Sequence, residues 1–157
     1  MTLVMLLLSV AAAQAYVVAA AWLGLQAPDP VVGLAAFAGL WWPRRTLPLA
    51  ALVLGLGRAV VLAEPAGGQV FCAWFALAVV AAQRPDPRRA AENLYPRFAW
   101  AALSAAGAWA LGGWVLRALF DVPLQSGREL FLGVLVVLPL AKLAMLGARS
   151  AGWVAVR

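Results

Sequence analysis

Three basic side chains stand inside apolar stretches of this sequence, where a charge is costly. Arg58 interrupts LGLGRAVVLAEPAGG, Lys142 lies in VLPLAKLAML, and Arg117 lies near the end of a third apolar run. Charges in such places often mark ion pathways or pair inside a helix bundle. They can also extend their aliphatic stems to the membrane surface, which is called snorkelling. Glu64 follows Arg58 by about 9 Å of helix, so these two groups could meet.

We expect snorkelling at all three positions. Arg117 is followed by Asp121 at the fourth position, the spacing of an ion pair on one helix face. Lys142 lies two turns from the end of its run and can reach the surface. Arg58 can extend toward Glu64 or the outer surface, and the alternative is a polar contact inside the bundle or with a partner helix.

The residue inventory argues against catalysis. There is no histidine, and Cys72 is the only cysteine, which excludes imidazole bases, imidazole metal ligands, thiolate clusters and an internal disulfide. No P-loop, nucleophile elbow or metal-spaced carboxylate pair is present. We therefore expect no enzymatic activity, cofactor or metal ion, and we expect Cys72 to pack as a small apolar residue.

The composition is that of a membrane protein. The chain is 66% hydrophobic and 11% charged, whereas soluble domains average roughly 45–50% apolar and about 25% charged residues. The apolar residues form long runs separated by short polar clusters, as in polytopic membrane proteins. The net charge of +6 comes from arginines between those runs. This placement favours attraction to anionic lipid over nucleic-acid binding.

Six apolar segments predict an all-α polytopic protein with a single six-helix transmembrane domain over residues 1–157. The predicted spans cover approximately residues 2–24, 29–42, 46–64, 69–83, 98–120 and 130–148. The first lacks a basic n-region, so we interpret it as a retained helix rather than a signal peptide. The second is short, about 18 Å of helix against a hydrocarbon core of ~30 Å. It must begin in the preceding turn, thin the bilayer or be partly re-entrant.

The loops differ in charge. One set carries Arg44, Arg45, Arg84, Arg88, Arg89, Arg97, Arg149 and Arg157, and the other carries Arg128 with Asp29, Glu64, Asp121 and Glu129. Positive loops stay in the cytoplasm, which predicts cytoplasmic N- and C-termini. Within the fifth span, Ser104, Ala108 and Gly112 recur every four residues, and we expect this face to pack inside the bundle.

The order of motifs from Leu25 to Gln83 resembles the MreD family, the membrane subunit of the bacterial cell-elongation (rod-shape) machinery. That family has an apolar first helix, a "PD" turn, a short second segment, a glycine-rich helix ending in "GLLRD", and a Pro-x-Gly turn into a fourth helix. Here these features read APDPVVGLAAFAGLWW, LGLGRA and AEPAGGQVFCAWFALA, over roughly a third of the chain. The last two spans match only in hydropathy. Ala59 replaces the aspartate that follows the family's arginine. Any pairing or positioning role of that aspartate is therefore lost here or shifted to Glu64.

The resemblance implies a fold similar to the substrate-binding subunits of energy-coupling-factor transporters. It also implies a non-catalytic scaffold in the bacterial inner membrane, serving cell shape and peptidoglycan synthesis. The implied partner is a single-span MreC-like protein, and through it a RodA-type glycosyltransferase and a class B penicillin-binding protein, with the MreB filament below. No catalytic residue carries over. The structural or interface candidates are Pro28, Asp29, Gly55, Arg58, Glu64, Pro65 and Gly67.

Two other functions are compatible with the sequence. A small-molecule-binding transporter subunit could use the same architecture, and it would need a ligand-sized cavity open to the outer side and lined by tryptophans. An accessory structural subunit of another large membrane complex could use the eight tryptophans and the small-residue faces for pigment or lipid contact. Without histidine it could not use imidazole to ligate chlorophyll magnesium or haem iron.

Overall fold

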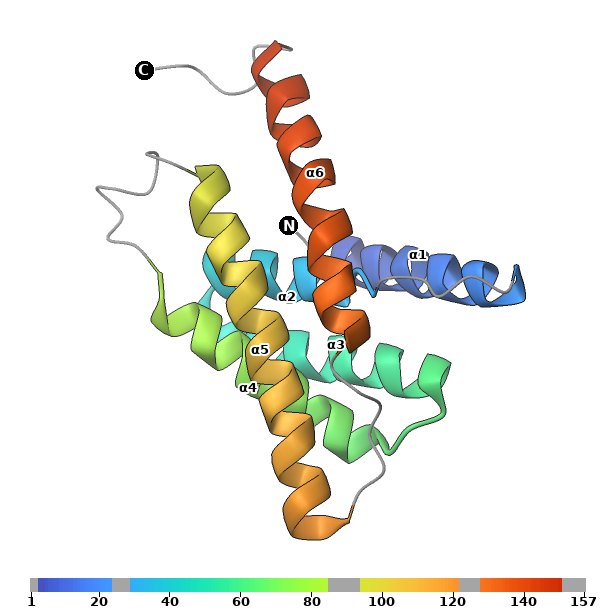
Figure 1. Ribbon diagram of the computed structural model, residues 1–157. Coiled ribbons are helices and arrows are strands. Elements are labelled where there is room, and N and C mark those ends of the chain that lie inside the picture. The colour runs from blue at the N-terminus through green and yellow to red at the C-terminus, as the bar shows by residue number, and fades with distance from the viewer. Residues whose placement is uncertain (1–2, 24–28, 85–93, 122–127, 151–157) are drawn as a thin grey trace.

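A computed structural model of the chain describes residues 3–23, 29–84, 94–121 and 128–150. These residues form six helices and no strand (Figure 1). The helices are α1 (Leu3–Trp22), α2 (Val31–Trp41), α3 (Leu47–Leu62), α4 (Ala66–Ala82), α5 (Leu94–Phe120) and α6 (Arg128–Ser150), with a short 3-10 turn at Arg44–Thr46 before α3. The prediction of an all-helical chain is confirmed, and each helix overlaps one predicted segment.

Helix length and composition support a membrane span at two of the six predicted segments. Among the described residues, Arg44–Leu62 and Leu94–Phe120 are long and apolar enough to cross a membrane, with 19 and 27 residues. By contrast, α2 has 11 residues and α4 has 17. At ~1.5 Å per residue, these two helices are about 16 and 25 Å long, which is less than a hydrocarbon core of ~30 Å. The expected shortness of the second segment is confirmed.

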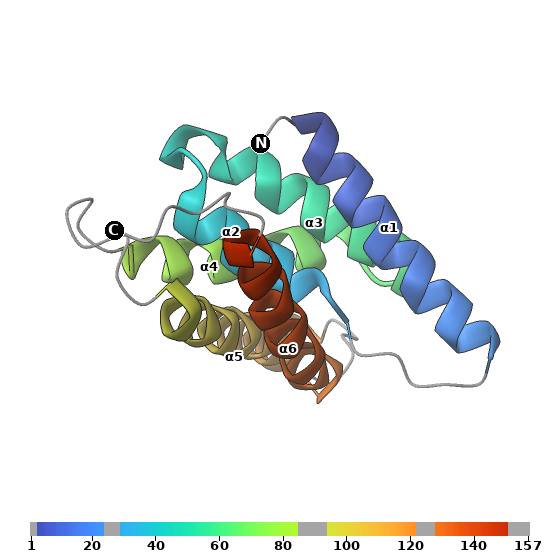
Figure 2. The same cartoon turned by 90° about the horizontal axis from the view of Figure 1, so that it is seen from above.

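The shortest helix lies at the centre of the fold. Figures 1 and 2 show α5 and α6 running together and crossing steeply over α1 and α3. α2 contacts all five of the other helices, and α4 packs mainly against α3 and α5. A helix with neighbours around most of its circumference must be apolar on nearly every face. The sequence VVGLAAFAGLW satisfies this requirement, because it contains no polar side chain.

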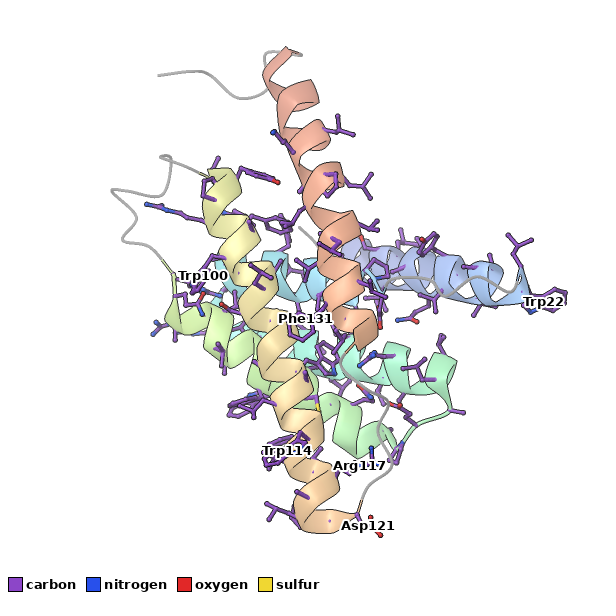
Figure 3. All side chains as sticks on the ribbon, viewed as in Figure 1. Trp22, Trp100, Trp114, Arg117, Asp121 and Phe131 are labelled. Atoms are coloured by element: carbon purple, nitrogen blue, oxygen red, sulfur yellow. The ribbon has the colours of Figure 1, made fainter. Side chains whose placement is uncertain are left out.

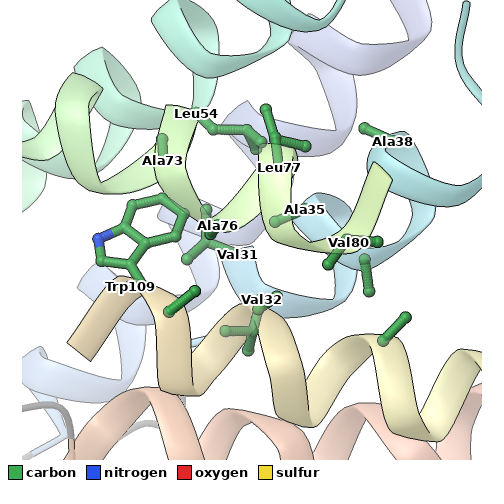
Figure 4. Close-up of a cluster of buried hydrophobic side chains, with 14 of the residues drawn as sticks. Val31, Val32, Ala35, Ala38, Leu54, Ala73, Ala76, Leu77, Val80 and Trp109 are labelled. Carbon is green, nitrogen blue, oxygen red and sulfur yellow. The ribbon is translucent and has the colours of Figure 1, made fainter. Parts of the chain in front are cut away.

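Small and branched apolar side chains fill the core. In Figure 4, side chains of α2, α3, α4 and α5 converge around Leu77. Leu54, Leu77 and Trp109 are the largest of these groups, and each is at most 2% exposed. Most of the remaining core consists of alanine and valine, including Val31, Val32, Ala35, Ala38, Ala73, Ala76 and Val80. Such side chains let the helices approach closely.

Two glycines lie where α4 packs against its neighbours α3 and α5. A Cβ atom on Gly55 of α3 would lie 2.6 Å from the backbone nitrogen of Val70 of α4. A Cβ atom on Gly112 of α5 would lie 3.3 Å from Sγ of Cys72. Gly112 and Ala108 are buried and Ser104 is partly buried, so most of the predicted small-residue face of α5 packs inside the molecule. Cys72 is fully buried, which confirms its predicted packing role.

The outer surface carries large apolar side chains on every helix. Figure 3 labels four of them: Trp22, Trp100, Trp114 and Phe131, with exposed fractions between 45% and 89%. Others include Leu8 of α1, Phe37 of α2, Val60 of α3, Trp74 of α4 and Leu143 of α6. Large exposed apolar side chains, where they gather, are typical of faces that meet lipid or protein.

We predict that Gly55→Ala lowers the free energy of unfolding by about 1–3 kcal/mol or more, because the added methyl group meets backbone atoms that cannot rotate away. Thermal unfolding in detergent, followed by circular dichroism, measures the change. Gly67→Ala is the matched control, because a Cβ atom there has no neighbour within 4 Å. Equal unfolding temperatures for the two variants would contradict the packing of α3 on α4.

Candidate functional site

The most polar part of the interior is an ion pair between Arg58 of α3 and Asp29, which precedes α2. Nε of Arg58 donates to Oδ2 of Asp29 at 2.7 Å. The side chains are 4% and 8% exposed. An isolated charge at this depth would cost several kcal/mol, and pairing with good geometry offsets that cost. The predicted snorkelling of Arg58 toward Glu64 is therefore wrong, and the alternative of a polar contact inside the bundle is confirmed.

Gln69 of α4 extends the pair into a network. Its Oε1 accepts hydrogen bonds from Arg58 Nη1 at 3.4 Å and from the indole Nε1 of Trp109 at 3.0 Å. Its Nε2 donates to Oε2 of Glu64. The Arg58 guanidinium also lies over the ring of Trp109, 5.5 Å from the ring centroid, a cation–π distance. Glu64 is therefore linked to Arg58 through Gln69.

Backbone features hold these side chains in place. Oδ1 of Asp29 accepts a hydrogen bond from the backbone N–H of Val31 at 3.0 Å, so one carboxylate both holds the first N–H of α2 and binds Arg58. At the other end, Ala63 adopts a left-handed conformation with φ 52°. The N–H groups of Ala63 and Glu64 both reach the carbonyl of Ala59. This Schellman-type turn ends α3 and places Glu64 beside the start of α4.

Helix α6 touches the same site through its backbone. A Cβ atom on Gly133 would lie 2.9 Å from the carbonyl carbon of Asp29 and closer still to its oxygen. Only glycine permits such an approach. Asp29 thereby joins α2, α3 and α6, while Gln69 and Trp109 add α4 and α5. Five of the six helices meet at this network.

The structure brings together three of the seven residues singled out from the sequence: Asp29, Arg58 and Glu64. Gly55 lies one turn before Arg58 and serves close packing. Pro65 is exposed and begins α4, and Gly67 is exposed on the first turn of α4 with open space around it. Pro28 lies outside the described residues.

Sequence reasoning missed Gln69 and Trp109, although hairpin geometry could have found part of the network. Asp29 and Arg58 stand 15 and 14 residues on either side of Arg44, where α2 turns into α3. Antiparallel neighbours at equal distance from their turn lie at the same level. Gln69 and Arg58 also lie at similar distances from the turn between α3 and α4. Gln69 follows Glu64 by five residues, and Arg58 precedes Glu64 by six. Trp109 had no such signal, because α5 packs across the other helices.

The other basic residues named above behave differently. Lys142 is exposed, and its Nζ lies 5.8 Å from the ring centroid of Tyr95, which agrees with an outward-reaching side chain. Arg117 and Asp121 are both exposed (Figure 3). Their described contact is the backbone hydrogen bond from Asp121 N–H to the Arg117 carbonyl. The predicted side-chain ion pair between these two described residues is absent, because Asp121 leaves the helix with φ 52°.

A second feature is an apolar groove of about 550 Å³ between α1, α2 and α6. Its described lining residues are Ser9, Ala13, Tyr16, Pro30, Gly33, Leu34, Gly133, Val136, Val137, Leu140 and Ala141. Positions 9, 13 and 16 share one face of α1, and positions 133, 137 and 140 share one face of α6. The lining contains no tryptophan among the described residues, unlike the cavity expected of a small-molecule transporter subunit.

Comparison of the chain with protein-family models, with curated proteins and with solved structures gives no match. Interpretation of this site therefore depends on its own geometry. Both oxygens of Asp29 are engaged, and Glu64 is bonded to Gln69. A carboxylate held in this way is poorly placed to exchange protons with a substrate, whereas it is well placed to fix five helices relative to one another.

We predict that Arg58→Met destabilises the protein by about 3–5 kcal/mol, because Asp29 is left as a buried unpaired carboxylate. Adding Asp29→Asn should recover part of this loss, since an asparagine side-chain oxygen can still accept the hydrogen bond from the Val31 N–H without carrying a charge. Chemical denaturation of the single and double variants measures the coupling energy. Arg117→Met is the control, because Arg117 is exposed. Additive effects of the two substitutions would refute the pair.

Proposed function

We propose that the protein is a non-catalytic scaffold subunit of the bacterial cell-elongation complex, similar to the MreD family. On this proposal it lies in the inner membrane and binds a single-span MreC-like protein. Through that partner it would join a RodA-type glycosyltransferase and a class B penicillin-binding protein. The overall arrangement would resemble the substrate-binding subunits of energy-coupling-factor transporters.

One observation carries the proposal: the motifs behind the resemblance converge on one network. Asp29 comes from the "PD" turn, Arg58 from the glycine-rich helix, and Gln69 follows the proline–glycine turn. In the structure Asp29 and Gln69 each accept a hydrogen bond from Arg58. The order and spacing of the motifs thus have a common structural cause, since each supplies one member of the same buried site.

The exposed apolar side chains and the distribution of charged residues support placement in a membrane. Exposed leucine, valine, phenylalanine and tryptophan side chains occur on all six helices. Trp100 and Trp114 lie 14 residues apart on α5, about 21 Å along the axis, as aromatic residues near two membrane interfaces would. Arg44, Arg45 and Arg84 gather where α2 and α4 end, whereas Glu64 lies at the opposite end of α3.

The groove between α1 and α6 is the place we assign to the partner's membrane helix. It is bordered by two helix faces, and Ala13 and Gly33 provide the small residues that membrane helix interfaces favour. Ser9 and Tyr16 are the polar side chains among its described lining residues. So apolar a lining suits a hydrophobic helix better than a small polar ligand, which needs several convergent polar groups.

We predict that gentle solubilisation and affinity purification yield a stable complex with a single-span MreC-like protein, identified by mass spectrometry. Ala13→Phe should reduce the recovered partner at least several-fold, because the phenyl ring fills the groove. Ala12→Phe is the matched control, since Ala12 is exposed and does not line the groove. The proposal fails if no such partner is recovered and deletion of the protein leaves cell shape unchanged.

We also predict the topology. A reporter fused after Arg157 should be active as a cytoplasmic fusion, and one inserted between Asp121 and Glu129 should be active as an external fusion. This follows from retention of arginine-rich loops in the cytoplasm. Alkaline phosphatase and green fluorescent protein fusions give opposite readouts of the two sides. The reverse pattern would overturn both the span count and the orientation.

A further inference from the structure

Arg84 is anchored beside the end of α2 and keeps one unsatisfied donor. It follows the end of α4, and its Nε donates to the carbonyl of Gly39 at 2.6 Å. Its Nη2 is buried and has no hydrogen-bond partner. Gly39 lies against Val80 of α4, so this guanidinium is held where α2 and α4 end together. An anchored arginine with a spare N–H group is preorganised to bind an anion.

Trp42 supplies a second unsatisfied donor at the same helix end. It caps the C-terminus of α2, three residues after Gly39. The residue is 7% exposed, and its indole Nε1 is buried without a partner. Buried polar groups nearly always have partners. Leaving one unsatisfied costs about 1–3 kcal/mol. Two such donors at one helix end point to an acceptor that the described chain does not supply.

The charge around these donors is positive. Burial, together with the nearby charge of Arg44, lowers the pKa of the Arg84 guanidinium from its usual value. Arg84 stays charged at neutral pH, because arginine is not deprotonated in proteins. Figure 2 shows the ends of α2 and α4 and the start of α3 on the same side of the molecule. The three carboxylate side chains that the structure describes, Asp29, Glu64 and Asp121, stand at other helix ends.

We propose that Arg84, Arg44 and the indole N–H of Trp42 form a binding site for a phosphate group where α2 and α4 end. A guanidinium can bind phosphate oxygens through two parallel N–H groups, and Arg44 neutralises further charge. The phosphate can belong to the headgroup of an anionic phospholipid or be free inorganic phosphate. The lipid source depends on the membrane placement proposed above. The site itself does not depend on the partner complex.

The test is native mass spectrometry of the full-length protein in detergent with added phosphatidylglycerol or phosphatidylcholine. We expect wild type to retain phosphatidylglycerol preferentially, and we expect Arg84→Gln to reduce that retention about tenfold or more. Trp42→Phe, which keeps an aromatic ring but removes the N–H, should give a smaller loss. It also keeps the proposal testable if Arg84→Gln does not fold.

Arg117→Gln is the matched control, because it removes one arginine at the far end of α5. Equal loss in Arg117→Gln and Arg84→Gln would overturn the site, since it would indicate attraction to net charge alone. A parallel arm adds inorganic phosphate and follows thermal unfolding. Stabilisation of wild type but not Arg84→Gln, without lipid preference, identifies free phosphate as the ligand. Absence of both effects overturns the proposal, and neither result affects the co-purification test.

Discussion

The buried ion pair between Arg58 and Asp29 is the constraint on which the architecture depends. Neither charge can be left alone in an interior made of alanine, valine and leucine. The start of α2 must therefore stay beside the second half of α3. Gln69 and Trp109 complete the guanidinium's surroundings from α4 and α5. The pair adds specificity that a uniformly apolar core would lack, because helices sliding past one another would separate the charges.

Much of the secondary structure could be predicted from hydrophobic runs and from proline and glycine positions. Six helices were expected and six are described, and the shortness of α2 followed from its sequence between Pro30 and Pro43. Spatial order was harder to predict. Hydropathy does not indicate that an 11-residue helix occupies the centre, because an apolar circumference suits lipid and protein surroundings equally well. The steep crossing of α5 and α6 over α1 and α3 is likewise set by tertiary packing.

About half of the residues in the buried network could be predicted from the sequence. Arg58 was conspicuous because charges are rare in apolar runs, and Asp29 stood out within a proline turn. Their pairing was missed because Glu64 is nearer in sequence, and local spacing was weighed above the symmetry of the α2–α3 hairpin. Trp109 could not be assigned to the site, since a tryptophan in a membrane-like helix has many uses. The left-handed conformations of Ala63 and Asp121 carry no sequence signal, because glycine usually occupies such positions.

The contact of Gly133 with the carbonyl of Asp29 has a consequence for biogenesis. Asp29, Arg58 and Gln69 all belong to the first half of the chain, so their bonds can form while α5 and α6 are still being synthesised. Gly133 lies against the carbonyl of Asp29, the residue whose side chain binds Val31 and Arg58. The contacts of α6 with this site are therefore the last that synthesis makes possible.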